Sequence, residues 1–264
     1  MENGAAIRLL SFLGVFLSVA AAEYLWPRRT LTVSKQQRWF CNIAIVAIDS
    51  VAARLLLPVM PMGMAEIARA KGWGLFNQLA VPRWMEIVAV VMILDLVIYL
   101  QHRSFHRVPL FWRFHRMHHT DLDLDVSSGN RFHPIEILVS LIIKVGAVAL
   151  LGAPAVAVVI FEVILNASSL FNHGNLGIPV RVDGWLRLFV VTPDMHRVHH
   201  SVIPPETDSN FGFSFPWWDR MLNSYRDQPR DGHIGMIIGL KGFRDEQKLD
   251  LGSLLMMPFQ GRNG

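Results

Sequence analysis

The chain has 264 residues, of which 52% are hydrophobic and only 17% are charged, and its mean hydropathy of +0.33 is too high for an ordinary soluble domain of this length. Its single cysteine, Cys41, excludes an intramolecular disulfide and any zinc ribbon or iron–sulfur cluster that needs several thiolates. The net charge of +4 comes with basic residues beside apolar segments, which favours anionic lipid headgroups over nucleic acid as the partner.

Four or five apolar stretches follow one another along the chain, and most approach the length of about 20 residues that a bilayer crossing needs. They are residues 5–26, 39–60, 84–101, 136–151 and 154–173. A secretory signal is the alternative for residues 9–22, but the later spans favour a membrane helix there. No linker or low-complexity tract interrupts the chain, so we treat residues 1–264 as one domain. The sequence predicts an all-α integral membrane bundle of four to five membrane-inserted helices, with N-terminal transmembrane helices in residues 1–83.

The last two apolar stretches are expected to form a helical hairpin. Gly152 and Pro154 lie between them and can break the helix and turn the chain back. Lys144 and Glu162 each lie eight residues from this turn, so antiparallel helices would bring them to one depth. Because a charge inside a membrane is costly unless it is partnered, we predict that they form an ion pair. The alternative is that Lys144 extends to the membrane interface.

The loops indicate an orientation. Residues 27–38 hold four basic side chains, whereas residues 61–83 hold three over nearly twice the length. Positive charge is enriched in cytoplasmic loops, so the first loop is expected in the cytoplasm. All the histidine groups would then lie on that side, where residues 102–135 and 174–264 would form a helical cap. We therefore expect a protein of the bacterial inner membrane with its metal site on the cytoplasmic side.

Histidines dominate the predicted cap. The stretch "TPDMHRVHHS" holds three of them in H-x-x-H-H spacing, and "FHRMHHT" repeats this spacing about eighty positions upstream. Residues three and four apart share a helix face, so each motif is expected to direct its imidazoles into one pocket. Thr192 and Pro193 read as the start of the helix that carries the second motif. The expected metal ligands are ten of the eleven histidines: His102, His106, His115, His118, His119, His133, His173, His196, His199 and His200.

The number of histidines indicates two ions, because eight to ten imidazoles exceed what one ion can bind. Imidazole suits zinc, iron, copper and nickel alike, so the ligand type leaves the metal open. A surface cluster that binds adventitious nickel is the main alternative. The eleventh histidine, His233, is expected to be an ordinary core or surface residue.

Polar residues near these motifs are candidates for orienting the ligands. Asp95 lies seven residues before His102 on one apolar helix, and an intramembrane carboxylate is a functional candidate by default. We expect several side chains to hold the second nitrogens of ligand histidines, namely Asp95, Asn130, Asn172, Asp208 and Asn210. The alternative for Asp95 is an ion pair with Arg54.

Five segments in this order resemble the fatty acid hydroxylase superfamily, also called the sterol desaturase family: "DLVIYLQHRSFH", "LFWRFHRMHHTD", "NRFHPIE", "NHGNLGIP" and "TPDMHRVHHSVIPPETDSNFGFSFPWWDR". The likeness covers about residues 85–225. It implies an integral membrane enzyme with a histidine-ligated dinuclear iron centre that uses O2 and two electrons to hydroxylate or desaturate a lipid. The family's histidine boxes, and hence the implied catalytic residues, fall on His102, His106, His115, His118, His119, His196, His199 and His200.

One departure from the family pattern concerns the histidine between the second and third boxes. His173 matches this position, but Ser169 stands four residues earlier, where some hydroxylases of the family have a second histidine. A ligand is therefore either missing or supplied by His133.

The electrons must come from a separate reductase, ferredoxin or cytochrome-type partner. The sequence has no G-x-G-x-x-G after a strand, no cysteine cluster and no C-x-x-C-H haem site. Basic residues of the predicted cap could meet an acidic carrier, with lipid headgroups as an equal alternative: Arg103, Arg107, Arg113, Arg116 and Arg197.

We expect a di-iron lipid oxygenase, with hydroxylation favoured over desaturation, and two other functions are alternatives. Zinc also accepts imidazole ligands and could substitute for iron, so a dinuclear zinc lipid hydrolase is the first alternative. It is disfavoured because the chain has no H-E-x-x-H or similar element. A metal transporter is the second, although transport sites usually lie near the bilayer midplane and these histidines gather at helix ends.

Overall fold

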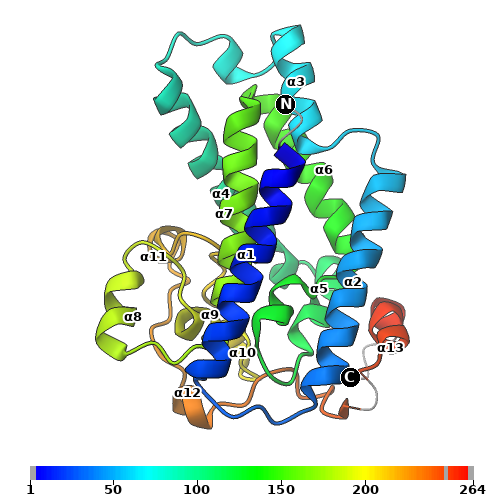
Figure 1. The fold of residues 1–264 in the computed structure, drawn as a ribbon, viewed down its shortest axis with the longest axis vertical. Coiled ribbons are helices and arrows are strands. Elements are labelled where there is room, and N and C mark those ends of the chain that lie inside the picture. Colours follow the sequence, from blue (N-terminus) through cyan, green and yellow to red (C-terminus); the bar gives the residue numbers. More distant parts are fainter. Residues whose placement is uncertain (1–3, 247–248, 261–264) are drawn as a thin grey trace.

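Five long helices form the body of the molecule in the computed structural model, which describes residues 4–246 and 249–260 (Figure 1). They are α1 (Gly4–Leu25), α2 (Lys35–Leu56), α4 (Arg83–Arg107), α6 (Pro134–Leu151) and α7 (Ala155–Asn172). Within the described ranges there are five helices long and apolar enough to cross a membrane, and no β-strand is formed there. The predicted all-α membrane bundle is confirmed, and α4 continues beyond the predicted end at residue 101, so that it carries both His102 and His106.

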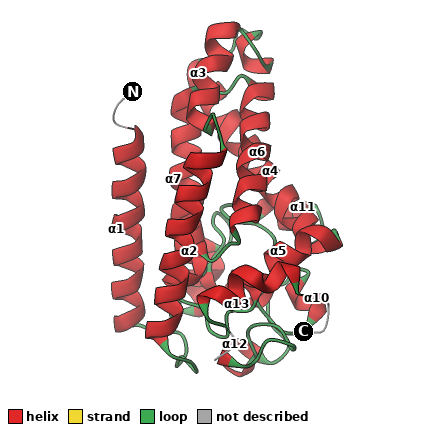
Figure 2. Ribbon diagram, turned by 90° about the vertical axis from the view of Figure 1, so that its right-hand side faces the viewer, coloured by secondary structure: helices red, strands yellow, loops and turns green. Residues whose placement is uncertain are grey.

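Shorter helices lie at the two ends of this bundle (Figures 1 and 2). α3 (Pro61–Lys71) and η1 (Leu75–Asn77) lie at the end where α6 turns into α7. The cap lies at the other end and is built from α5 (Pro109–His119), η2 (Val126–Asn130), α8 (Val180–Leu186), α9 (Pro193–His199), α10 (Pro204–Thr207), α11 (Trp217–Met221), α12 (Gly232–Gly235), α13 (Leu251–Met256) and η4 (Met257–Phe259). The connection between α1 and α2 also lies at the cap end of the molecule.

The α6–α7 hairpin turns where the sequence predicts it. Gly152 ends α6 with φ 66°, a left-handed conformation that glycine adopts without a steric penalty, and Pro154 precedes the first residue of α7. The predicted ion pair inside this hairpin is wrong, however. Glu162 pairs with Arg8 of α1, because α1 packs along α7, and Lys144 takes part in no ion pair among the described residues.

A buried charge network fixes the cap against α2. The Arg38 guanidinium donates to Asp121 at 2.6 Å and to Asp125 at 2.8 Å, in the loop that follows α5. Burial alone would raise the pKa of Asp121, but the positive charges of Arg38 and Arg131 hold this pKa at about 2. Such paired, hydrogen-bonded charges can be buried where isolated ones cannot. The network therefore ties the histidine-bearing end of α5 to the membrane bundle.

Candidate metal centre

Nine histidines from four parts of the chain converge where the bundle meets the cap. In each of two groups, every residue offers one nitrogen within 4.8 Å of the others. The first group is His102, His106, His115, His119 and His199, and the second is His118, His173, His196 and His200. α4 and α5 contribute four members of the first group, whereas the end of α7 and the α9 segment contribute three members of the second.

The two H-x-x-H-H motifs interlock. On α5, His115 and His119 enter the first group and His118 enters the second; around α9, His196 and His200 enter the second and His199 the first. The expectation that each motif fills one pocket is therefore wrong. At 3.6 residues per turn, positions i and i+4 differ in direction by only about 40°, whereas position i+3 is turned about 60° the other way. The middle histidine consequently reaches the neighbouring pocket.

The local structure that presents the second motif is as the sequence predicts. The Thr192 hydroxyl accepts a hydrogen bond from Met195 N at 3.3 Å, and Pro193 occupies the first turn of α9. Such a capped start needs no backbone partner for the Pro193 nitrogen. α9 is short, so both His196 and His199 lie within its capped turns, and His200 is its C-cap residue.

Backbone carbonyls fix the tautomer of four histidines. Nδ1 of His102 lies against the Phe211 carbonyl oxygen, and Nδ1 of His118 lies against that of Arg131. In the same way, His173 faces the Ser169 carbonyl and His199 faces that of Ser209. All four distances are 2.7–3.2 Å. A carbonyl oxygen can only accept a hydrogen bond, so each Nδ1 carries the proton and each neutral ring leaves Nε2 as a bare lone pair.

These lone pairs face one another. The Nε2 atoms of His118 and His173 are 3.1 Å apart, and the Nε2 atoms of His102 and His115 are also 3.1 Å apart. Nδ1 of His115 lies 2.7 Å from the Glu136 carboxylate, so its Nε2 is bare as well. Two bare nitrogens at hydrogen-bond distance repel unless a cation lies between the rings. The donor set therefore fits two metal ions held by imidazole nitrogen.

The electrostatics keep the cap histidines neutral, which is the form that binds metal. Burial lowers the pKa of His115 to about 3 and that of His173 to about 4. For His196, His199 and His200, burial and then the neighbouring histidines lower the pKa well below the ordinary 6.5. Protons therefore compete weakly for these nitrogens near neutral pH.

One expected ligand lies elsewhere. His133 is the N-cap residue of α6: its Nδ1 accepts from Ile135 N at 3.1 Å, and its Nε2 lies 3.1 Å from the Leu255 carbonyl. With both ring nitrogens used in this way, it belongs to neither histidine group. His233, expected to be an ordinary residue, also lies outside the groups and faces Asp194.

The five polar residues expected to orient ligands are dispersed. Asp208 lies 3.3 Å from Nδ1 of His106. Within residues 4–246 and 249–260, the other four make no hydrogen bond to a histidine of either group. Asp95 accepts from Trp218 Nε1 at 2.8 Å, Asn172 donates to the Phe213 carbonyl, Asn210 donates to the carbonyls of Met195 and Arg226, and Asn130 lines a cavity. The alternative pairing of Asp95 with Arg54 is not formed either.

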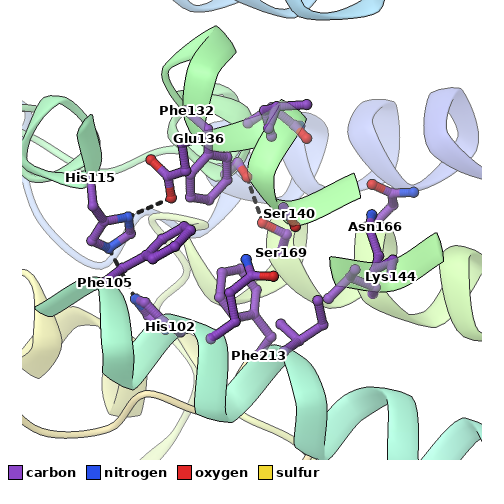
Figure 3. A pocket seen from close by; sticks show the side chains of 16 residues that line it. His102, Phe105, His115, Phe132, Glu136, Ser140, Lys144, Asn166, Ser169 and Phe213 are labelled. Carbon is purple, nitrogen blue, oxygen red and sulfur yellow. Dashed lines mark hydrogen bonds and ion pairs between the residues drawn. The ribbon is translucent and has the colours of Figure 1, made fainter. Parts of the chain in front are cut away.

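Sequence reasoning missed Glu136. Its Oε1 accepts a hydrogen bond from His115 Nδ1, and Figure 3 shows this contact beside the cavity. The available signal is the "RFHPIE" segment, which offers a histidine as the candidate ligand, whereas the carboxylate three positions later contacts the first histidine group. The carbonyls that orient the other rings leave no signal in the sequence.

A cavity of about 120 Å³ adjoins the first histidine group between α4, α6 and α7 (Figure 3). His102 and His115 form one wall, and Phe132 and Phe213 lie beside them. Its far part is polar and includes Ser140 and Lys144 of α6. This places a small, partly apolar space directly against the candidate metal ligands.

Comparisons with known proteins point to one family. The fatty acid hydroxylase family model matches residues 87–224. The chain is 27% identical to an ornithine lipid hydroxylase of Rhizobium tropici over 246 residues, which cover 89% of this chain and 72% of the relative. It is 31% identical to the alkylglycerol monooxygenase of Caenorhabditis elegans over 143 residues (52% of this chain, 26% of the relative), and 29% identical to that of Danio rerio over 190 residues (67% and 40%). The chain thus spans less than half the length of these two monooxygenases. No solved structure is significantly similar.

Proposed function

This chain belongs to the fatty acid hydroxylase family, and from that premise we propose that it hydroxylates a polar membrane lipid at a dinuclear iron centre held by nine histidines. The observation that carries the proposal is the pair of interlocked imidazole groups whose lone pairs face one another. The choice of iron and O2 is supported by the relatives, which are named as a hydroxylase and as monooxygenases. Zinc could occupy the same nitrogen ligands, so metal analysis belongs to the test.

In this proposal each of the two ions has its own set of histidine ligands. One ion would be held by the five histidines of the first group and the other by the four of the second. Iron bound there supplies the capacity, with O2, two electrons and two protons, to replace an unactivated C–H by C–OH and release water. The protein binds the metals, orients the rings and excludes water around the substrate.

Aromatic side chains shield the ligands. Phe132 stacks on His118 with ring centroids 4.4 Å apart, and the Phe213 and His102 centroids are 5.0 Å apart. Both phenyl rings also line the cavity beside the first group. They would confine a substrate segment next to His102 and His115 while keeping bulk water from the reacting carbon.

A second cavity supports docking of a separate electron carrier. A groove of about 750 Å³ on the cap is lined by Arg113, Arg116 and Lys241. Trp112 also lines it, and its ring centroid lies 5.0 Å from that of His106 and 5.4 Å from that of His119. We propose that an acidic ferredoxin-, cytochrome- or reductase-type protein docks there, because opposite charge guides such encounters.

The other basic residues expected to meet the carrier do not line this groove. Arg197 is buried and pairs with Asp194. Arg103 lies near Tyr99 and the Leu222 carbonyl. The docking role is therefore assigned to Arg113, Arg116 and Lys241.

The orientation remains a proposal with the metal centre on the cytoplasmic side of a bacterial inner membrane. It is supported by the basic connection between α1 and α2, which lies at the cap end (Figure 1), and by the bacterial source of one relative. A cytoplasmic cap would also be accessible to soluble electron carriers.

The decisive experiment compares lipid extracts of a bacterial host with and without the protein, grown under ¹⁸O2, by mass spectrometry. A lipid that gains one labelled oxygen establishes hydroxylation, and one that loses two hydrogens establishes desaturation. Metal content of the purified protein is measured in parallel. Two zinc ions together with O2-independent lipid cleavage would overturn the proposal in favour of a hydrolase.

A further inference from the structure

A cavity of about 300 Å³ lies between α2 and the start of α6, outside the metal centre. Asp49 and Arg54 of α2 line it. Its remaining wall includes Asn130, Phe132 and Ile137, and these three residues also line the cavity beside His102 and His115. The α2 cavity therefore adjoins the proposed reaction space across a single layer of side chains.

Asp49 is a buried carboxylate without a partner. Its exposed fraction is 8%, its Oδ1 is buried without a hydrogen bond, and no ion pair of Asp49 occurs in residues 4–246 and 249–260. A lone carboxylate within a membrane helix is unfavourable unless something cationic or hydrogen-bonding reaches it. The other buried carboxylates of the long helices do have partners. Glu162 pairs with Arg8 and Glu86 with Arg83, Asp95 accepts from Trp218, Glu136 accepts from His115, and Glu23 accepts from the backbone N–H groups of Val126 and Asn175. Asp49 is therefore poised for a ligand.

The charges around the α2 cavity indicate the chemistry of that ligand. Glu136 lines the adjoining cavity beside His102 and His115, close enough for its charge to act on Asp49, and its Oε2 is also without a hydrogen bond. The two carboxylates favour a cation that brings several hydrogen-bond donors, as a primary ammonium does. Arg54, exposed five residues after Asp49 on α2, offers a site for an anionic group in the same cavity.

We propose that the α2 cavity binds the headgroup of a zwitterionic amino-lipid, with its ammonium on Asp49 and its carboxylate or phosphate near Arg54. This inference rests on the proposed function and names the substrate class of the same site. It also bears on where the lipid reacts. A cavity of about 150 Å³ holds a benzene-sized molecule, so the 120 Å³ beside His102 and His115 admits only a short segment. The oxidised carbon is then one close to the headgroup, and most of each acyl chain stays in the bilayer.

The test measures binding to the purified, metal-loaded protein in lipid nanodiscs, using two tritium-labelled probes. One is an ornithine lipid with a free amine, and the other is the same lipid with that amine acetylated, which removes the positive charge and two of the three N–H donors and adds an acetyl group. A charge-assisted hydrogen bond at a buried carboxylate predicts about 10- to 100-fold tighter binding of the free amine. Equal binding of the two probes to the wild-type protein overturns the proposal without any variant.

Variants then locate the effect. Asp49→Asn should abolish the discrimination between the probes, whereas Ser50→Ala, at a neighbouring position of the same cavity, should retain it. Arg54→Gln should weaken binding of both probes. If Asp49→Asn keeps its metal and still discriminates, the assignment of Asp49 is wrong. Labelled-oxygen incorporation is scored separately: product without discrimination refutes only the headgroup site, and discrimination without any oxygenated product refutes only the proposed function.

Discussion

The Glu136 carboxylate accepts a hydrogen bond from His115 Nδ1 at 2.7 Å, and both side chains are buried. Because this contact fixes the ring tautomer and raises the basicity of Nε2, it should strengthen metal binding at the first histidine group only. Glu136→Gln is expected to weaken the affinity of that site about 10- to 100-fold.

Competition with a chromophoric chelator measures this loss of affinity. One of the two ions should leave the Glu136→Gln protein at a lower chelator concentration than it leaves the wild type. Ser140→Ala, on the same helix and in the same cavity, is the matched control and should release both ions as the wild type does. Loss of both ions together from Glu136→Gln would contradict the separate ligand sets.

Histidines from one motif should affect different ions. His118 belongs to the second group and His199 to the first, so His118→Ala and His199→Ala should each lower the metal content by about one ion per chain. Either substitution should abolish hydroxylation, because the proposed chemistry needs both metals, while membrane insertion is retained. His133→Ala should keep both ions, because its ring nitrogens are used at the start of α6. Metal loss from the His133 variant would show that it is a ligand after all.

The ion pair between α1 and α7 gives a stability prediction. Arg8 and Glu162 have side-chain exposures of 29% and 11%, so solvent screens their attraction only in part. A double-mutant cycle with Arg8→Gln and Glu162→Gln should give a coupling energy of about 1 kcal/mol. The same cycle with Lys144→Met in place of Arg8→Gln should give a smaller one. Unfolding free energies in mixed micelles give both coupling energies. A larger coupling energy for Lys144 with Glu162 than for Arg8 with Glu162 would support the Lys144 pairing instead.

The cap should lose stability on mild acidification through His233. Burial lowers the pKa of His233 to about 4, against the attraction of Asp194. In the unfolded chain the His233 imidazole binds a proton below about pH 6.5, whereas in the folded protein it does so only near pH 4. Between these two pH values the unfolded state therefore binds more protons than the folded state. Stability therefore falls by about 2 kcal/mol between pH 7 and pH 5.

Asp194, Arg187, Arg197 and Arg28 are the charged groups that act on His233. Arg187 and Arg197 stay protonated, and Arg197 holds the pKa of Asp194 below its ordinary value despite burial. Thermal unfolding of metal-loaded protein at pH 7 and pH 5 checks the prediction, with His233→Gln expected to lose less stability than the wild type. Equal losses would assign the acid sensitivity to other groups.

The basic groove of the cap predicts a salt-dependent redox interaction. Lys241→Glu reverses an exposed charge there and should raise the KM for an acidic plant-type ferredoxin by about tenfold at low ionic strength, less at high salt. Turnover driven by dithionite, which needs no docking, should be unchanged. Lys71→Glu, an exposed lysine at the opposite end of the molecule, serves as the control. Similar effects of both variants would place the carrier elsewhere.

Local patterns made much of the bundle predictable. Runs of apolar residues locate all five membrane helices, although α4 continues past its predicted end at residue 101 to Arg107. They do so because a helix in a bilayer satisfies every backbone group internally. Thr192 with Pro193 and Gly152 with Pro154 mark helix ends through short-range backbone chemistry. The spacing of the histidine motifs indicates metal binding for the same reason, since it places imidazoles on one side of a helix.

Contacts between distant segments were beyond such patterns. Whether Glu162 meets Arg8 or Lys144 depends on which helix packs against α7, and the sequence carries no local sign of that choice. His133 and Glu136 stand three residues apart, yet only Glu136 contacts the first histidine group. The start of α6 directs His133 toward Leu255 of the C-terminal segment and Glu136 toward His115 of α5.

The amino-acid sequence by itself determined that this is a helical membrane protein with a histidine-rich candidate metal site, because composition and periodicity act over a few turns of helix. Only the tertiary structure decided how nine histidines divide between two groups, which carboxylate and carbonyls orient them, and that Asp49 is left facing a cavity. Those outcomes depend on the direction in which each side chain leaves its helix and on the neighbour that packing places there, which chain order does not encode locally.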